Sequence, residues 1–273
     1  MANHARKLRG SAVSAPFYTP DMPWTADDVR AALAERADPE RAIASARYFK
    51  TGAGEYGAGD VFLGITVPQV RSIVKGHRGL PLGEIDALLD DAQHEHRLAG
   101  VLLLVAAYPS EPEAVVDHYL AAVRRGRVNN WDLVDASSEF ILGPWLAERD
   151  RGVLRELAAS PSLWERRVAV LATFEFLKRG DASTTLELAE LLLTDREDLM
   201  HKAVGWMLRE SGKRVSRETL TGFLDAHAAA MPRTMLSYAT EHLDQEDRAR
   251  YRAARQERAA RASALPATRV VPK

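Results

Sequence analysis

Residues 197–211 read EDLMHKAVGWMLRES, a segment whose polar and apolar residues alternate with the period of a helix. Ala203 and Met207 lie four positions apart, so both fall on one face, which indicates a buried stripe. Patterns of similar length recur on both sides of this segment, joined by short turns such as Gly180-Asp181. They predict helices over residues 163–178, 183–193, 216–229 and 232–243.

The N-terminal half of the chain carries local signals for the starts of helices. Thr25 and Asp28 have the spacing of a capping box, and Asp38-Pro39 places proline at the first position of the next helix. Two amphipathic stripes follow further along the chain. The first comprises Glu84, Ile85, Leu88 and Leu89, and the second comprises Val115, Val116, Tyr119 and Leu120.

Strand signals are scarce, and residues 61–65 form the one plausible short strand, which could equally be a packed loop. Consecutive helices of similar length with short connections predict antiparallel pairs stacked side by side. The expected fold is therefore all-α, an α-solenoid of HEAT-like repeats.

Composition places the chain among globular proteins. It has 273 residues, 46% of them hydrophobic, which is enough for a sizeable core. It has no cysteine, so it offers no thiolate nucleophile or thiolate metal site, and neither an apolar membrane span nor a secretory signal is visible. The expected location is the cytoplasm. Lys and Arg number 37 against 38 Asp and Glu, so a nucleic-acid face would need an uneven distribution of charge.

Domain boundaries follow from changes in composition. Residues 1–24 lack periodicity, and we expect them to form a tail. We expect residues 25–243 to form the helical repeat domain and residues 244–273 to form an extension that ends in a second tail. The glycine-rich loop at residues 52–59 lacks the ending of a phosphate-binding loop, and we expect a flexible insertion. The composition of the extension predicts a helix rich in arginine, which includes Arg248, Arg250, Arg252, Arg255, Arg258 and Arg261.

The segment most suggestive of chemistry is Asn129-Asn130-Trp131-Asp132-Leu133-Val134-Asp135. On a helix, Trp131 and Asp135 stand one turn apart on the same face. A carboxylate beside an indole is partly desolvated, which strengthens its attraction for a positive charge. Equally, a lone helical tryptophan is most often a core residue, and its neighbouring aspartate most often pairs with arginine.

Three further places set an aromatic ring near a charge: Trp164 with Arg167, Trp206 with Arg209 and Glu210, and Tyr48 beside Arg47 and Lys50. Composition alone favours core packing for Trp206 and a structural ion pair for Arg167. In a solenoid, however, successive helix pairs present equivalent faces to the concave side, where residues distant in sequence converge.

Two apparent sites have little support. His94-Glu95-His96 directs its imidazoles to different sides of a helix, so a shared metal ion is not expected. Ser137-Ser138 has no histidine nearby in sequence and no nucleophile-elbow glycines, so a hydrolase triad is not indicated.

The chain resembles the AlkD-like DNA alkylation repair enzymes, which are HEAT-like-repeat DNA glycosylases. The resemblance extends from about residue 25 to residue 243, and it includes Ala46 to Lys50 with Phe62 to Ile65 and Pro68. Its more specific motifs are Trp131 to Asp135 followed by Phe140 to Gly143, Trp164 to Arg167, and Lys202 to Glu210. The chain departs from the family in having Asn130 where a second tryptophan is frequent, and in the loop at residues 52–59.

The resemblance implies excision of N3- and N7-alkylated purines from duplex DNA held on a concave face. By motif position, the catalytic residues would be Asp135, Trp131 and Trp206, with Asp135 stabilising the sugar oxocarbenium ion and positioning water. Contacts to DNA would come from Arg167, Tyr48, Lys202 and Arg209. The expected partner is alkylated double-stranded DNA in the nucleoid. The protein is expected to act as a monomer, to have no contact with a membrane, and to need neither a metal nor another cofactor.

Two alternatives to a glycosylase remain at this stage. A HEAT-type module would bind DNA or protein through the same face without catalysis. A metal-dependent nuclease is the weaker alternative, because the sequence shows no convincing cluster of ligands.

Overall fold

The computed structural model describes residues 24–264, with side chains up to residue 257. The expected tails lie largely outside this range. The helices of the first half are α1 (Ala26–Ala34), α2 (Pro39–Tyr48), α3 (Val67–Gly76), α4 (Leu82–Leu89), α5 (His94–Ala107), α6 (Pro112–Arg124), α7 (Trp131–Asp135) and α8 (Ser138–Leu146). Those of the second half are α9 (Gly152–Ala158), α10 (Leu163–Ala172), α11 (Phe174–Lys178), α12 (Ser183–Leu191), α13 (Asp198–Arg214), α14 (Arg217–His227), α15 (Arg233–Ala239) and α16 (Gln245–Ala264).

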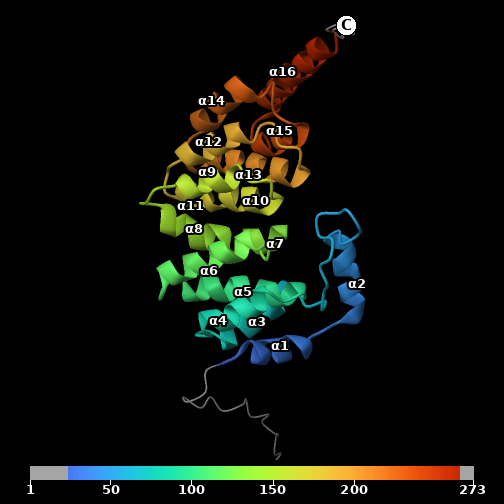
Figure 1. Ribbon diagram of the computed structural model, residues 1–273. Helices are drawn as coiled ribbons and strands as arrows, with labels where there is room; N and C mark the ends of the chain where they lie inside the picture. Colours follow the sequence, from blue (N-terminus) through green and yellow to red (C-terminus); the bar gives the residue numbers. More distant parts are fainter. Residues whose placement is uncertain (1–23, 265–273) are drawn as a thin grey trace, which may run out of the picture.

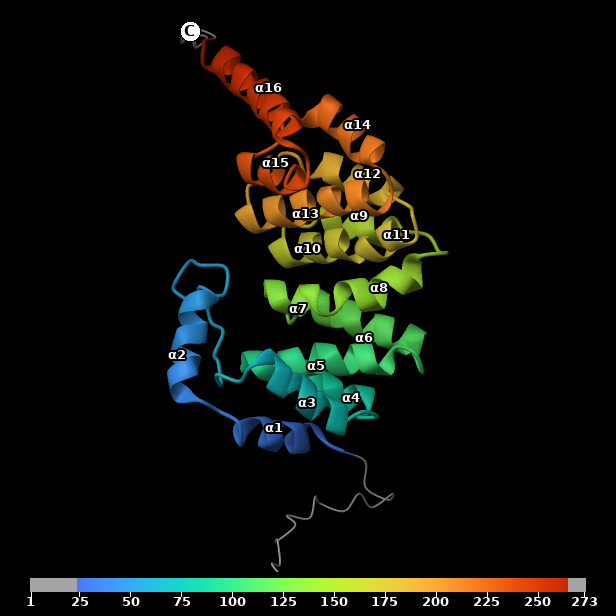
Figure 2. The ribbon, with the colours of Figure 1, turned by 180° about the vertical axis from the view of Figure 1, so that it is seen from behind.

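The helices stack in chain order from one end of the molecule to the other, as an all-α helical repeat solenoid (Figure 1). Helix α10 packs against α7, α8, α9 and α13, and α13 packs in turn against α14 and α15. Helix α2 departs from the stack, because it runs alongside the ends of the other helices rather than between them (Figure 2). None of the helices within residues 24–264 combines the length and the apolar character that a membrane span requires.

The predicted helix starts are confirmed by their caps. Thr25 and Asp28 form the reciprocal capping box, with the Thr25 backbone N–H donating to the Asp28 carboxylate at 2.8 Å. The Asp38 carboxylate accepts from the backbone N–H of Arg41 at 3.0 Å, and Pro39 takes the first position of α2. Both predicted amphipathic stripes are helical. Their apolar residues Ile85, Leu88, Leu89, Val115, Val116 and Tyr119 are buried, and Leu120 is partly buried.

One predicted element differs from the structure. The helix expected over residues 163–178 is divided at Thr173 into α10 and α11. The buried Thr173 hydroxyl donates to the carbonyl of Val170 at 2.7 Å, which competes with the regular helical hydrogen bonds. Of the two alternatives for residues 61–65, the structure has the packed loop, with one isolated bridge between Val61 and Gln93.

Helix α13 approaches α15 so closely that only glycine fits between them. A Cβ added to Gly205 would lie 2.5 Å from the carbonyl oxygen of Met235 and 2.6 Å from the Cβ of Tyr238. These are atoms of the backbone and of a rigid Cβ, so an alanine would force the two helices apart. Because Trp206 follows Gly205, this contact also sets the position of that indole.

Gly205→Ala is therefore expected to lower the free energy of unfolding by about 1–3 kcal/mol, measured by urea denaturation. Gly222→Ala is the matched control, because Gly222 lies in α14 with open space around its Cα. There the gain in helix propensity should stabilise the protein by up to about 1 kcal/mol. Equal effects of the two substitutions would contradict close packing of α13 on α15.

Candidate functional site

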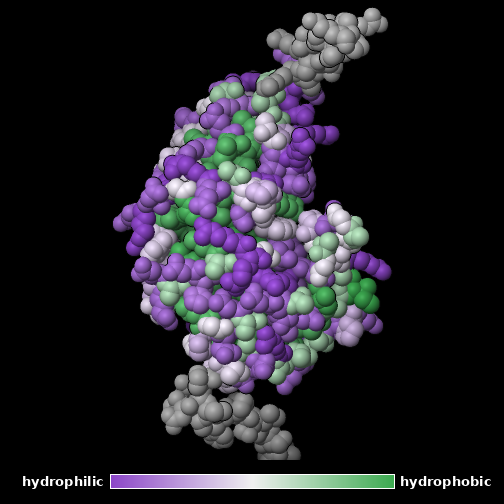
Figure 3. Space-filling view, viewed as in Figure 1, coloured by the Kyte–Doolittle hydropathy of each residue, from purple (hydrophilic) through white to green (hydrophobic). Residues whose placement is uncertain are grey.

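A cleft of about 400 Å³ lies where α2 and the loop that follows it face the ends of α7, α10, α13 and α15. In the space-filling view the surface is hollowed beside α2 and its loop (Figure 3). We call this the aromatic cleft. Its walls are Tyr48, Tyr56, Trp131, Arg167, Leu199, Lys202, Trp206, Arg209 and Tyr238.

Helix α7 presents Trp131 and Asp135 on one face, as their spacing predicts. The helix has only five residues, and its start is fixed by the buried Asn130, whose side-chain oxygen accepts from the backbone N–H of Trp131 at 2.9 Å. Leu133 and Val134 on its other side are fully buried. The position of both candidate residues is therefore determined by a buried anchor.

Asp135 forms a two-pronged ion pair with Arg167 of α10. The guanidinium Nε and Nη2 donate to the two carboxylate oxygens at 3.0 and 2.9 Å. Arg167 Nη1 also donates to the carbonyl of Leu199 at 2.8 Å, so the arginine links α7, α10 and the start of α13. Its side chain is 6% exposed and that of Asp135 is 23% exposed, so solvent reaches the carboxylate more readily than the guanidinium.

The Asp135 carboxyl has an unusual protonation equilibrium. Burial raises its pKa above the ordinary value, and the nearby positive charge of Arg167 only partly offsets this effect. Several of the described carboxyl groups have a pKa that departs from the ordinary value, and among them Asp135 is the one whose pKa is raised. The fold thus holds a charged carboxylate where its ionised form is disfavoured, a state typical of functional sites.

Helix α13 supplies the opposite wall with Trp206, Lys202 and Arg209. Trp206 is half-buried: its ring lies 5.8 Å from that of Phe174, and the rest faces the cleft, so it is both packed and accessible. Lys202 pairs with Asp198 at 2.8 Å and remains 41% exposed. Arg209 pairs with Glu241 and Glu210, which leaves it less free than Lys202.

An aromatic stack supports Trp131 from the side of α2. Phe49 lies nearly parallel to Trp131 with ring centroids 5.3 Å apart, and Phe49 also stacks on Phe62. Tyr48 meets Trp131 edge to face at 6.1 Å, although its own side chain is largely exposed. These contacts fix the plane of the Trp131 indole.

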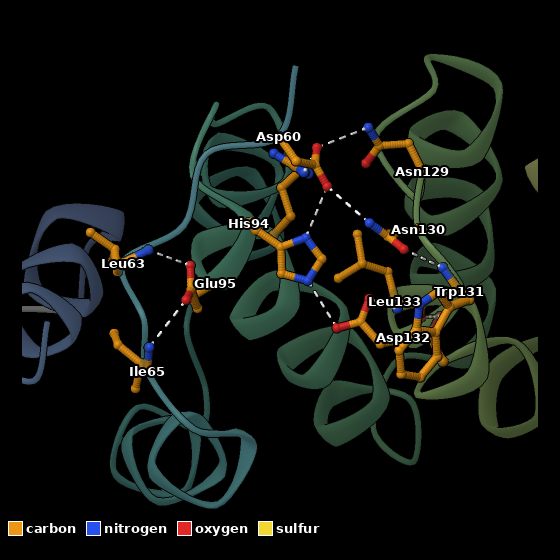
Figure 4. Close-up of polar contacts among 12 residues, drawn as sticks. Asp60, Leu63, Ile65, His94, Glu95, Asn129, Asn130, Trp131, Asp132 and Leu133 are labelled. Carbon is orange, nitrogen blue, oxygen red and sulfur yellow. Dashed lines mark hydrogen bonds and ion pairs between the residues drawn. The ribbon is translucent and has the colours of Figure 1, made fainter. Parts of the chain in front are cut away.

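A buried polar network ties α5 to the short helix α7 (Figure 4). The His94 imidazole bridges two carboxylates, with Nδ1 3.0 Å from Asp60 and Nε2 2.8 Å from Asp132. Arg97 also bonds to Asp60, and Asn130 donates to Asp60 at 3.1 Å. Burial alone would lower the pKa of His94, but the bonds to Asp132 and Asp60 outweigh it and raise this pKa to about 9.

The two imidazoles of His94-Glu95-His96 have separate partners, as predicted, since His96 lies 3.0 Å from Asp91. Between them, the Glu95 carboxylate accepts hydrogen bonds from the backbone N–H groups of Leu63, Gly64 and Ile65 at 2.9, 2.8 and 3.1 Å (Figure 4). This carboxylate fixes the segment that returns from α2 to the stack. Within the described part of the chain, no group of three or more His, Asp or Glu side chains is arranged to hold a metal ion.

The glycine-rich loop at residues 52–59, expected as a flexible insertion, is closed by specific contacts. The backbone N–H of Gly57 donates to the carbonyl of Lys50 at 3.1 Å, and the Gly52 N–H donates to the Glu55 carboxylate at 2.9 Å. Tyr56 at its tip lines the cleft and meets Trp164 edge to face at 6.1 Å. The sequence reasoning missed Tyr56, although an aromatic residue among glycines was a visible signal.

The structure brings together all seven residues singled out from the sequence. Tyr48, Trp131, Arg167, Lys202, Trp206 and Arg209 line the aromatic cleft, and Asp135 lies beside it, bonded to Arg167. Arg167, which the resemblance places on a DNA phosphate, forms the ion pair with Asp135 that composition alone favours. Three of its five N–H donors are used within the protein, and two remain.

Comparisons with known proteins agree with this architecture. The family model described as DNA alkylation repair enzyme matches residues 29–243. A solved structure described as a predicted DNA alkylation repair enzyme from Enterococcus faecalis has the same fold, with a TM-score of 0.63 and 21% identity. The match covers 77% of this chain and 98% of that one. No curated protein matches the chain. The chain belongs to the DNA alkylation repair enzyme family.

Proposed function

We propose that this protein is a DNA glycosylase that releases N3- and N7-alkylated purines from duplex DNA. The observation that carries the proposal is the joint position of Asp135 and Trp131 on α7, with the Trp206 indole across the same cleft. The raised pKa of the Asp135 carboxyl, caused mainly by burial, supports it. Residues 25–243 would form the repeat domain that carries this site.

The reaction needs little beyond electrostatic stabilisation. Alkylation at N3 or N7 makes the purine cationic and a good leaving group, so the base departs without being protonated. As the N-glycosidic bond breaks, the deoxyribose becomes an oxocarbenium ion. A carboxylate about 4 Å from this charge contributes on the order of 4 kcal/mol at an effective dielectric constant of 20. Asp135 would provide this charge and orient the attacking water, like the second carboxylate of a glycosidase.

The ion pair with Arg167 serves this role in two ways. Its positive charge favours ionised Asp135 against the effect of burial, and its planar, two-pronged geometry holds the carboxylate in one orientation. The two N–H groups left on Arg167 are free of bonds within the protein and suit a phosphate oxygen on either side of the lesion. Arg167 would then connect the binding of the backbone to the position of Asp135.

The two tryptophans are suited to the developing positive charge. Indole faces attract cations, and each would contribute roughly 0.5–2 kcal/mol where water is excluded. Trp131 is already oriented by Phe49, so little conformational entropy is lost on binding. Tyr48, Lys202 and Arg209 surround the cleft and would contact the DNA backbone, which implies weak dependence on base sequence.

The test is release of free base from a duplex with a single 7-methylguanine, followed by chromatography, with 3-methyladenine and a bulkier N7 adduct as further substrates. The proposal expects free modified base and an abasic strand in the presence of EDTA. Binding of the duplex without release would favour the non-catalytic module, and EDTA-sensitive strand cleavage would favour a nuclease. Either result would overturn the proposal.

A further inference from the structure

A second cleft, of about 530 Å³, lies between α15 and the C-terminal helix α16. Four of its lining residues are arginines, Arg233 on α15 and Arg248, Arg252 and Arg255 on α16, and the one carboxylate among the lining residues is Glu241. We call it the arginine cleft. Its residues on α16 lie beyond position 243, where the match to the family model ends.

The arginines of α16 up to residue 257 lie on different faces of the helix. Arg248, Arg252 and Arg255 follow the i, i+4, i+7 spacing of one face, which lines the cleft. Arg250 lies on another face and pairs with Asp225 at 2.6 Å. The buried Tyr251, next to the cleft face, anchors α16 to α14 by a 3.0 Å bond to the same carboxylate. The charge of Arg250 is thus neutralised, while the cleft face collects positive charge beside the anchor at Tyr251.

The positive charges in the arginine cleft lack carboxylate partners within the described residues. Arg252 and Arg255 donate to the backbone carbonyls of Arg248 and Met231 at 3.1 and 3.0 Å, and between residues 24 and 257 no ion pair involves Arg233 or Arg248. Glu241 is engaged by Arg209. Like charges one turn apart on a helix destabilise it by about 0.2–0.5 kcal/mol per pair, so the arrangement costs stability unless an anion binds there.

The arginine cleft adjoins the aromatic cleft. Arg209 lines the aromatic cleft, Glu241 lines the arginine cleft, and the two form an ion pair at the boundary. Helix α15 contributes to both, with Tyr238 on one side and Ser237 on the other. In the ribbon, α15 and α16 follow α13 at the end of the stack, so a ligand that passes along the aromatic cleft continues onto these helices (Figures 1 and 2).

We infer that the arginine cleft binds the phosphodiester backbone of duplex DNA beside the candidate site. The inference rests on the proposed function for the identity of the ligand. Guanidinium groups match phosphate oxygens in charge and in hydrogen-bond geometry, and such contacts are independent of sequence. The chain as a whole has a net charge of −1, so a local cluster of unpaired arginines supplies an attraction for DNA that the overall charge does not.

The experiment compares the salt dependence of duplex binding by the full chain and by the double variant Arg248→Gln with Arg252→Gln. Each lost phosphate contact lowers the slope of log K against log salt by about 0.9, so the double variant should lose roughly 1.8. At 0.1 M salt its affinity should fall by at least about tenfold. Arg233→Gln, on a different helix, should lower the slope by about 0.9.

Arg250→Gln is the matched control, since it lies on the same helix and is already paired with Asp225. Its slope should equal that of the unchanged chain. Equal slopes for the unchanged chain, the double variant and Arg233→Gln would overturn the inference, as would absence of duplex binding by the unchanged chain. If the unchanged chain binds duplex but releases no base, the proposed function fails, while the slopes still decide whether the arginine cleft binds DNA.

Discussion

Asp135→Asn should slow release of 7-methylguanine under single-turnover conditions by at least about 10²-fold. Removing one group that stabilises charge in a transition state typically costs this much or more. Asparagine keeps the shape of the side chain and one acceptor for Arg167, but it removes the negative charge. Affinity for undamaged duplex should not fall, because a carboxylate contributes no attraction for phosphate.

The control is Asp117→Asn on α6, an exposed aspartate outside the site, which should leave the rate unchanged. The dependence on pH provides a second readout. Since the pKa of Asp135 is raised by burial, the rate of the unchanged chain should fall on acidification at a higher pH than an ordinary aspartate would give. A rate for Asp135→Asn equal to that of Asp117→Asn would remove Asp135 from the mechanism.

The stability of the fold should decrease between pH 6.5 and pH 9 because of His94. The imidazole is 2% exposed, and its pKa is raised to about 9, compared with 6.5 in an unfolded chain. A raised pKa contributes stability that is complete below pH 6.5 and is lost as pH rises through the folded value. The shift corresponds to roughly 3 kcal/mol in the free energy of unfolding, to be measured by urea denaturation at each pH.

His94→Gln should remove this pH dependence. At pH 6.5 it should also destabilise the fold by about 3–5 kcal/mol, because the Asp132 oxygen that faces His94 would lose its charged partner in a largely buried place. His242→Gln, an exposed position, is the control and should retain the full dependence. A pH profile of His94→Gln that parallels that of the unchanged chain would show that another group titrates.

The sequence predicted what local chemistry determines. The caps at Thr25 and Asp38 and the shared face of Trp131 and Asp135 depend on residues within four positions of each other, and all are present in the structure. The sequence did not predict the break at Thr173. The apolar pattern continues through this residue, and it gives no sign that the threonine hydroxyl donates to the carbonyl three residues earlier.

Contacts across the stack were not predictable from spacing. Asp135 and Arg167 are 32 positions apart, and Asp60, His94 and Asp132 come from three separate segments. Each pair depends on how one helix packs on the next. The run His94 to Arg97 at the start of a long apolar helix did hold a signal, since polar residues on a fully buried helix require partners.

These contacts form one chain of support for the candidate site. The Asp60–His94–Asp132 network and Asn130 fix α7, Phe49 fixes the plane of Trp131, and the close approach at Gly205 places Trp206. Supports of this kind would keep the candidate catalytic groups in place without reorganisation during the proposed reaction.

The most direct test uses a duplex with a pyrrolidine whose protonated nitrogen replaces the anomeric carbon at an abasic position, compared with a neutral ring of the same shape. A site built for an oxocarbenium ion binds the cation more tightly, and we expect a preference of about 10²-fold or more in the unchanged chain. Asp135→Asn should lose most of that preference. Equal binding of the cationic and neutral rings by the unchanged chain would contradict the proposed role of the carboxylate and the two indoles.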